Sequence, residues 1–171
     1  MTPQKTGLTL YGAQVSVVAV DFGGTISTSR EDHVLAQKGV DPEAAATLQQ
    51  LAALGLRLLL ASNATAKETR WPALQAAGVH DLFSVALISY SLNVRKDDPL
   101  FYELVITAAQ CARHEVLFVG DRIDYDVLGP MRAGMQACLV RPDGLRPGER
   151  LPDGAVLIGH VRELPGLLAA G

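Results

Sequence analysis

The chain has 171 residues, of which 49% are hydrophobic, and a formal net charge of −3. This length and apolar content suit one compact domain, and the acidic charge without a long basic run disfavours electrostatic binding to nucleic acid or to a membrane surface. No segment approaches the roughly 20 consecutive apolar residues of a membrane span, and residues 1–14 are too polar for a secretory signal, so we expect a cytoplasmic protein.

Short apolar runs alternate along the chain with segments of helical period. The expected strands are residues 15–20, 56–61, 85–88, 116–119 and 137–140. Their hydrophobicity is continuous rather than alternating, which is typical of strands buried on both faces. The sequence therefore predicts an α/β fold, a Rossmann-like parallel sheet covered by helices on both faces.

Two expected helices have clear start signals. Asp41 and Asp98 each precede a proline, so each aspartate can cap a helix whose first residue is that proline. The first of these helices follows an Ala- and Leu-rich pattern and is expected to end at Gly55.

Less regular structure is expected elsewhere. Between residues 63 and 78 we expect a short helical turn, a break at Trp71-Pro72 and a second helix. Residues 141–154 are rich in Pro, Gly and Arg and are expected to form a loop. An edge strand at 156–158 and a terminal helix near 161–169 are expected to follow.

Reactive or charged side chains follow four of the expected strands. The first strand leads into Asp21-Phe22-Gly23-Gly24-Thr25, the second into Ser62-Asn63, and the third is followed by Lys96, while the fourth leads into Gly120-Asp121. Ligands bind outside the carboxyl ends of the strands in an open parallel sheet, so these groups should converge. A carboxylate beside backbone amides freed by glycine can attack or bind a phosphoryl group.

This order of motifs resembles the haloacid dehalogenase superfamily, whose members are mostly magnesium-dependent phosphohydrolases working through an aspartyl-phosphate. The resemblance covers roughly residues 15–140, and the pattern Gly-Asp-x-x-x-x-Asp at Gly120, Asp121 and Asp126 is its most specific part. It implies one domain over residues 1–171, with a core at about 15–140 and a strand and helix extension at 141–171. It also implies Mg²⁺ as cofactor and a phosphorylated substrate.

The resemblance gives each strand-end residue an expected role. Asp21 would be the nucleophile, and Lys96 would balance the charge of carboxylate and phosphate. The expected phosphate-binding residues are Gly24, Thr25, Ser62, Asn63 and Lys96. The expected Mg²⁺ ligands are Asp21, the backbone carbonyl of Gly23 and Asp121, with Asp126 in a supporting role, either through water or by orienting Lys96.

Two of these assignments have alternatives, and Asp124 is expected to lie on a helix surface without a role in the site. Ser62 can cap a following helix, either instead of binding phosphate or in addition to it. Lys96 belongs to a segment similar to the family's Lys-Pro-x-Pro, but Asp97 replaces the first proline. The adjacent Arg95 would take the place of Lys96 if the register differed by one residue.

Gly23 departs from the family's pattern. Phosphatases of the family usually have a second aspartate here, which protonates the leaving group and then activates water, and such help is worth roughly 10² to 10⁴-fold. His33 or Asp32 could act as a surrogate. Alternatively, the chain catalyses a different reaction, or it keeps the phosphate and metal pocket for binding or assembly without catalysis.

The connections between the motifs are short. Residues 26–56 can hold little beyond a small hairpin or loop and one helix, and residues 63–96 are similarly limited. Family members often insert a substrate-covering cap at one of these two places. We therefore expect no sizeable cap domain, and an open site that takes a bulky substrate or receives a lid from a neighbouring subunit.

Overall fold

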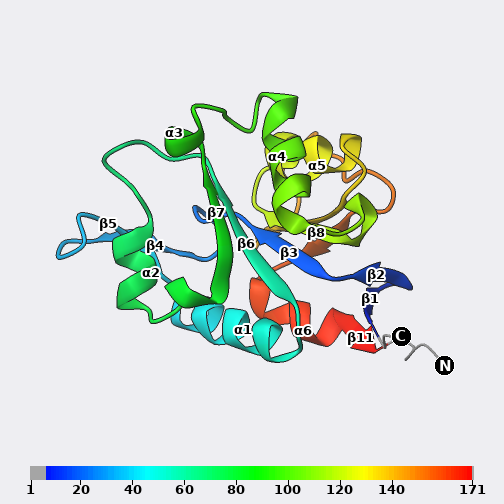
Figure 1. Ribbon diagram of the computed structural model, residues 1–171, viewed down its shortest axis with the longest axis horizontal. Coiled ribbons are helices and arrows are strands. Elements are labelled where there is room, and N and C mark those ends of the chain that lie inside the picture. The colour runs from blue at the N-terminus through cyan, green and yellow to red at the C-terminus, as the bar shows by residue number, and fades with distance from the viewer. Residues whose placement is uncertain (1–6, 171) are drawn as a thin grey trace.

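A six-stranded parallel sheet forms the centre of the molecule (Figure 1). The computed structural model describes residues 7–170. In spatial order the strands are β10 (Val156–Ile158), β9 (Gln136–Val140), β8 (Val116–Gly120), β3 (Val17–Val20), β6 (Arg57–Ser62) and β7 (Phe83–Ile88), and every neighbouring pair is parallel. The predicted α/β fold is confirmed.

The order of the strands reverses at β3. The chain first adds β6 and β7 on one side of β3, and then crosses over to add β8, β9 and β10 on the other side. Ligands of open α/β sheets bind at such a reversal, outside the carboxyl ends of the strands. Val20 lies opposite both Val119 and Leu60, so the loops that follow β3, β8 and β6 begin at nearly the same level.

Helices cover both faces of the sheet. Alternate residues of a strand point to opposite faces, so Val18 and Val20 pack in one apolar cluster with α1 (Pro42–Ala53), α2 (Trp71–Ala76) and α6 (Leu164–Leu167). Val17 and Ala19 pack on the other face with α4 (Pro99–Ala109). The π-helix η3 (Ile123–Leu128) and α5 (Gly129–Arg132) cover the β9 part of this second face.

The two predicted helix starts are confirmed. The Asp41 carboxylate accepts a hydrogen bond from the Ala44 amide at 3.0 Å, and the Asp98 carboxylate accepts one from the Leu100 amide at 2.9 Å. Each bond satisfies an amide that the first helical turn leaves without an internal partner. These caps fix where α1 and α4 begin and hence the lengths of the loops before them.

The segment after Ser62 differs from the prediction. Residues 63–70 contain one hydrogen-bonded turn, in which the Glu68 amide donates to the Thr65 carbonyl oxygen at 3.1 Å, but no helix, and α2 begins only at Trp71. The preceding Arg70 has a positive φ of 71°, which is incompatible with a continuous helix through this position. The expected short helix is therefore wrong, while the second helix is shorter than expected.

A second sheet joins the two ends of the described chain. It is antiparallel and contains β11 (Leu168–Ala170), β1 (Leu8–Leu10) and β2 (Ala13–Val15) in that order. Val15 therefore lies outside the central sheet, contrary to the prediction of a strand from residue 15. The expected terminal helix is also interrupted: the 3-10 helix η4 (Val161–Glu163) and α6 give way to β11, in a segment that contains the weak helix formers Pro165 and Gly166.

No cap of domain size lies between the motifs in the described chain. Residues 26–56 form the hairpin of β4 (Ser27–Asp32) and β5 (Gln37–Val40) followed by α1. Residues 63–96 form α2, the 3-10 helix η1 (His80–Leu82), β7 and α3 (Ser89–Leu92). A further 3-10 helix, η2 (Arg113–Glu115), precedes β8. The predicted hairpin and the absence of a sizeable cap agree with this structure.

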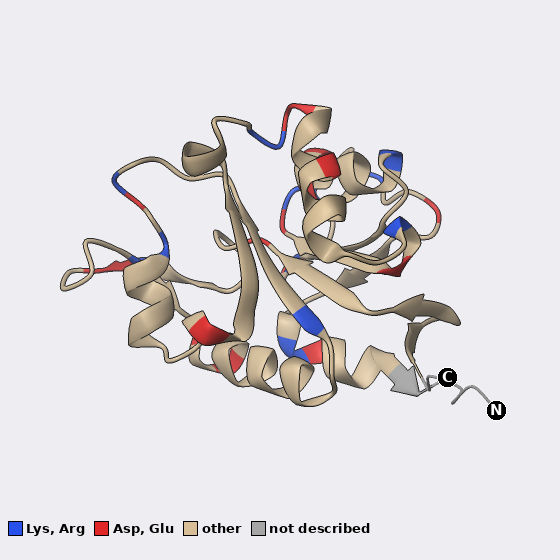
Figure 2. Ribbon diagram, in the orientation of Figure 1, with Lys and Arg blue, Asp and Glu red and all other residues tan. Residues whose placement is uncertain are grey.

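Acidic and basic residues are mixed along the chain. Figure 2 shows acidic and basic residues along the helices, the loops and the ends of the strands, with few in the middle of the central strands. Within residues 7–170 no helix is both long and apolar enough to cross a membrane.

Candidate active site

The loop after β3 carries Asp21 to the carboxyl edge of the sheet. The Asp21 amide donates to the Val119 carbonyl oxygen at 2.8 Å, which continues the pairing with β8 one residue beyond β3. The chain then turns sharply, because the amides of Thr25, Ile26 and Ser27 all donate to the Phe22 carbonyl oxygen at 3.0–3.2 Å. The Asp21 side chain is consequently held at the start of a tight turn and is largely buried.

The two glycines of this turn differ in whether a larger residue could replace them. Gly24 has a φ of +69°, and a Cβ atom on it would lie 2.3 Å from Oδ2 of Asp121. Only glycine allows this loop and the Asp121 carboxylate to approach so closely. Gly23 has no positive φ, and no atom lies within 4 Å of where its Cβ would be. The structure thus has room for a side chain at Gly23.

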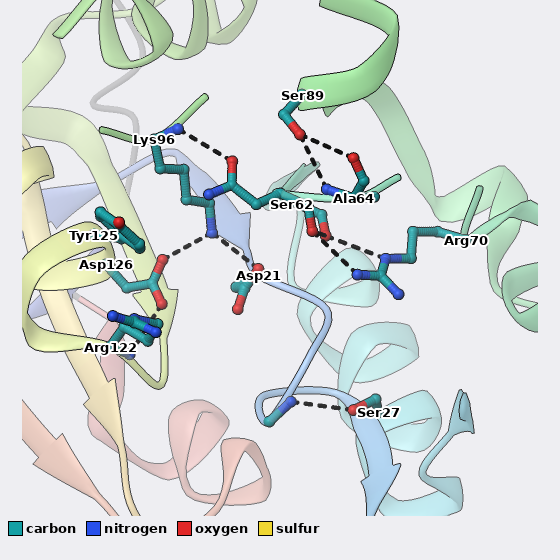
Figure 3. A network of polar contacts seen from close by, with 12 residues as sticks. Asp21, Ser27, Ser62, Ala64, Arg70, Ser89, Lys96, Arg122, Tyr125 and Asp126 are labelled. Atoms are coloured by element: carbon teal, nitrogen blue, oxygen red, sulfur yellow. Dashed lines mark hydrogen bonds and ion pairs between the residues drawn. The ribbon is translucent and has the colours of Figure 1, made fainter. Parts of the chain in front are cut away.

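Lys96 links two buried carboxylates (Figure 3). Its Nζ donates to Oδ1 of Asp21 at 2.9 Å and to Oδ1 of Asp126 at 2.8 Å. The backbone amide of Lys96 donates to Oδ1 of Asn63 at 3.1 Å, so the second loop of the site fixes the lysine. Burial lowers the pKa of Lys96, but the two carboxylates outweigh it and raise the pKa, which keeps the ammonium charged.

Arg95 lies outside the site. Its exposed side chain is 3.6 Å from the carboxylate of Asp97, which is exposed as well. The structure therefore brings Lys96 rather than Arg95 to Asp21. Because Asp97 faces solvent, its presence in place of proline leaves the contacts of Lys96 intact.

Three carboxylates meet at the carboxyl ends of β3 and β8. Asp21, Asp121 and Asp126 each offer an oxygen atom, and these atoms lie within 4.8 Å of one another. The wider turn of the π-helix η3 carries Asp126 back over the end of β8, where a Cβ atom on Gly120 would lie only 2.1 Å from the Asp126 Cγ atom. Such widened turns are frequent at functional sites.

The charges of this cluster favour a cation. Burial raises the pKa of Asp21, Asp121 and Asp126, that of Asp126 to about 6, and neighbouring carboxylates raise all three further. Lys96 opposes this for all three groups, and Arg141 also opposes it for Asp121, although Asp121 forms no ion pair with any described residue. The three carboxylates form a donor set that suits a divalent cation preferring hard oxygen ligands, as Mg²⁺ does.

Ser62 lies on the other side of Asp21 from Lys96 and Asp126 (Figure 3). Its hydroxyl oxygen accepts a bond from Nε of Arg70 at 3.3 Å and its hydroxyl donates to the Asn63 carbonyl oxygen at 3.3 Å. The alternative role as a helix cap is wrong, since the next helix begins only at Trp71.

Thr25 faces an open cavity beside Asp121. Its hydroxyl oxygen is buried and has no hydrogen-bond partner among the described residues. Gly24, Thr25 and Asp121 line this cavity of about 730 Å³ together with polar residues that include Lys38 and His160. Val140, Leu145 and two prolines also line it, but Phe, Tyr and Trp do not, so the cavity offers a ligand no aromatic ring.

The two surrogate acids expected from the sequence lie elsewhere. The Asp32 carboxylate accepts bonds from the Val34 and Leu35 amides in the hairpin turn, where His33 is exposed. Neither residue lines the cavity beside Asp121. Asp124 is exposed and pairs with Arg122 at 3.0 Å, as expected for a residue on the helix surface.

Two arginines that the sequence analysis did not single out take part in the site. Nε of Arg141 donates to the Asp121 carbonyl oxygen at 2.6 Å, and its two Nη atoms each lie 3.1 Å from an oxygen of Glu149. Arg141 directly follows β9. Inspecting the charged residues that come just after each expected strand would therefore have identified it. Arg70, which contacts Ser62, follows no strand and carries no such signal.

The chain is similar in sequence to known hydrolases. The family model of the haloacid dehalogenase-like hydrolases matches residues 7–134. The phosphoserine phosphatase of Thermus thermophilus is 34% identical over 123 residues, which are 72% of this chain and 49% of that protein. The glyceraldehyde 3-phosphate phosphatase of Methanopyrus kandleri is 31% identical over 100 residues, 58% of this chain and 42% of that protein. The chain thus spans about half the length of these relatives or less.

The solved structures that match nearly the whole chain include that of an uncharacterised protein of Listeria monocytogenes. It has a TM-score of 0.72 and 25% identity, and the match covers 89% of this chain and 96% of that one. The fold described above is therefore found in another protein of similar extent.

Proposed function

The chain belongs to the haloacid dehalogenase-like hydrolases, and from this premise we propose that it is a magnesium-dependent phosphohydrolase in which Asp21 attacks a phosphate monoester. The observation that carries this proposal is the cluster at the strand ends: buried Lys96 holds Asp21 and Asp126, and Asp121 stands beside them without an ion pair among the described residues. A nucleophilic carboxylate, a fixed cation and a further carboxylate that can bind a metal ion are what phosphoryl transfer to an aspartate requires.

Asp21, Asp121 and the carbonyl of Gly23 would hold the Mg²⁺ ion. Both oxygens of Asp126 are already engaged, Oδ1 with Lys96 and Oδ2 with the Arg122 amide at 3.0 Å, which suits a supporting role. When bound, Mg²⁺ supplies positive charge to the phosphoryl oxygens and to the carboxylates.

The remaining steps of ester hydrolysis involve the residues of the chain and water. Lys96 orients Asp21 through one carboxylate oxygen, and the other oxygen is available to bond to phosphorus while the ester bond breaks. The departing alkoxide then takes a proton from solvent, because Gly23 has no side chain to donate one. Water next attacks the phosphorus atom of the aspartyl-phosphate, the bond from phosphorus to the Asp21 oxygen breaks, and inorganic phosphate, the free Asp21 carboxylate and a proton that passes to solvent are released.

We propose small polar phosphate monoesters as substrates. The cavity beside Asp121, which Asp21 itself does not line, combines hydroxyl and charged groups with Val140, Leu145 and two prolines. It contains no Phe, Tyr or Trp, so a nucleobase would find no aromatic ring to stack on. Both curated relatives described above are phosphatases named for a small phosphate ester. Hydrolysis of a panel of phosphate esters, measured with Mg²⁺ and again with a chelator, tests the proposed function.

A second candidate function is phosphate and metal binding without turnover, and Gly23 is the observation that favours it. No steric feature of the loop requires glycine at this position. A protein that needed no acid or base could therefore retain the rest of the pocket. The same panel separates the two functions, because the binding protein would bind inorganic phosphate and Mg²⁺ but release no phosphate from any ester.

Asp121→Ala is expected to weaken Mg²⁺ binding by about tenfold or more, because it removes a charged oxygen ligand. Isothermal titration of the purified protein with Mg²⁺ measures the affinity directly. Asp124→Ala is the matched control, since Asp124 is an exposed aspartate nearby that pairs only with Arg122. Equal Mg²⁺ affinities for the Asp121 variant and the wild type would contradict the proposed ligand set.

The cavity beside Asp121 is open in the single chain, so we propose that a neighbouring subunit covers it when the substrate is small. Light scattering during turnover should then show an oligomer. Efficient hydrolysis of a small phosphate ester by a strictly monomeric protein would contradict this proposal.

A further inference from the structure

Arg70 is a buried arginine on a strained backbone. Its φ is 71° and its side chain is only 10% exposed. Residues other than glycine adopt this region at an energetic cost, and such outliers cluster at functional sites. The residue stands at the start of α2 but makes no capping hydrogen bond there with its side chain. Its conformation therefore calls for another explanation.

The side chain of Arg70 joins the two loops that surround Asp21. Nε donates to Oγ of Ser62, the last residue of β6, at 3.3 Å, and Nη2 donates to the carbonyl oxygen of Asn63, the first residue of the following loop, at 3.1 Å. The guanidinium carbon lies 4.7 Å from the centre of the Phe22 ring, and Phe22 directly follows Asp21. This stacking favours the planar cation of arginine over lysine.

The bond from Arg70 restricts what the Ser62 hydroxyl can do. A serine hydroxyl has one hydrogen, and its oxygen already accepts from Nε of Arg70. The hydrogen points to the carbonyl oxygen of Asn63, the next residue, over a long distance of 3.3 Å. An anionic phosphoryl oxygen is a stronger acceptor than a carbonyl oxygen. Arg70 thereby leaves Ser62 ready to donate to such an oxygen.

The position of Arg70 also complements that of Lys96. Arg70 and Ser62 lie on the side of Asp21 opposite to Lys96 and Asp126 (Figure 3). Burial lowers the pKa of Arg70, while the charges of Glu68 and Asp21 raise it, so the arginine and the nucleophile interact electrostatically. A phosphoryl group on Asp21 would then have a fixed cation on either side.

We propose that Arg70 is a positioning residue of the phosphoryl site, which orients the Ser62 hydroxyl toward a bound phosphate dianion and adds positive charge opposite Lys96. This inference rests on the proposed function for the location of the phosphoryl group. It differs from a purely structural role, in which Arg70 would only anchor residues 63–70 through Asn63 and through Glu68, whose carboxylate is 3.5 Å from Nη1.

The test compares Arg70→Gly with Arg70→Lys. Glycine removes the side chain and adopts a positive φ without strain, so the backbone is not penalised. Lysine keeps the charge but loses the planar fork. Gln110→Gly is the matched control, because Gln110 also has a positive φ, 52°, and follows the end of α4 farthest from Lys96. Titrations with inorganic phosphate at saturating Mg²⁺, with Mg²⁺ alone, and thermal melts are recorded for each variant.

Arg70→Gly should weaken phosphate binding by roughly tenfold to a hundredfold, the range for hydrogen bonds to a charged group. Mg²⁺ affinity should stay within about twofold of the wild type, and Arg70→Lys should fall between the wild type and the glycine variant. Added guanidinium ion should restore part of the phosphate affinity of Arg70→Gly, whereas sodium at the same ionic strength should not. Gln110→Gly should bind phosphate as the wild type does.

Two results would overturn the inference. One is a folded Arg70→Gly, or a folded Arg70→Lys if the glycine variant does not fold, that binds phosphate as tightly as the wild type. The other is a parallel loss of phosphate and Mg²⁺ affinity without guanidinium rescue, which is the signature of a structural anchor. Failure of the proposed function is distinguishable, because a wild type that hydrolyses no ester would still show the effect of Arg70 on phosphate affinity.

Discussion

Asp21→Asn is expected to lower phosphate ester hydrolysis by at least about 10³-fold, because an amide cannot form the bond to phosphorus that an anionic carboxylate forms. The fold should persist. Asparagine has the shape of aspartate, its side-chain oxygen can still accept from Lys96 Nζ, and the backbone bond from residue 21 to Val119 does not involve the side chain. Initial rates with an aryl phosphate, together with circular dichroism melts, measure both effects.

The matched control is Asp124→Asn, the same chemical change on an exposed carboxylate near the site. It should leave the rate within about twofold of the wild type, since the hydrogen bonds of the Asp124 side chain within residues 7–170 are with Arg122 and the Tyr125 amide. A folded Asp21→Asn that turns over at a rate comparable to the wild type would show that another group attacks phosphorus.

Gly23→Asp is expected to increase the hydrolysis of an alkyl phosphate by at least about tenfold, within the range for general acid and base catalysis. The alkoxide leaving group needs a proton. The new carboxyl group would lie in the same loop as the nucleophile Asp21, two residues after it. The structure removes the main steric objection, because Gly23 has no positive φ and open space where its Cβ would lie. An aryl phosphate, whose leaving group needs no proton, should gain less at the first chemical step.

Gly23→Asn separates the proton transfer from the shape of the new side chain. It fills the same space but cannot exchange a proton at neutral pH, so its rate with the alkyl phosphate should stay near that of the wild type. A stably folded Gly23→Asp with no gain on either ester would contradict the view that only proton transfer is missing. A different reaction or the binding function would then be favoured.

The architecture could be predicted because its signals are local. Continuous apolar runs marked the central strands, and Asp41 and Asp98 marked the starts of two helices through contacts only two or three residues away. Because parallel strands bring their carboxyl ends to one edge, the convergence of Asp21 with Lys96 and Asp121 followed from the expectation of a parallel sheet.

The missed features depend on contacts distant in sequence or on backbone angles. The second sheet pairs β1 with β11, so Leu8 lies opposite Ala170. A pairing between residues so distant in the sequence cannot be predicted from a local pattern. Arg70 was missed for a related reason: its partners are fixed only once residues 63–70 fold as a loop. The sequence also could not tell that Gly24, rather than Gly23, has the positive φ that the turn requires.

The most direct measurement is the mass of the acid-quenched protein during turnover of an aryl phosphate with Mg²⁺. Formation of the aspartyl-phosphate needs no proton for this leaving group, whereas its hydrolysis lacks the base that an aspartate at position 23 would provide. The wild type should therefore accumulate an adduct of one phosphoryl group on the peptide containing Asp21, and Gly23→Asp should accumulate less. Release of phosphate without any adduct on Asp21, or with the adduct on another residue, would contradict the account.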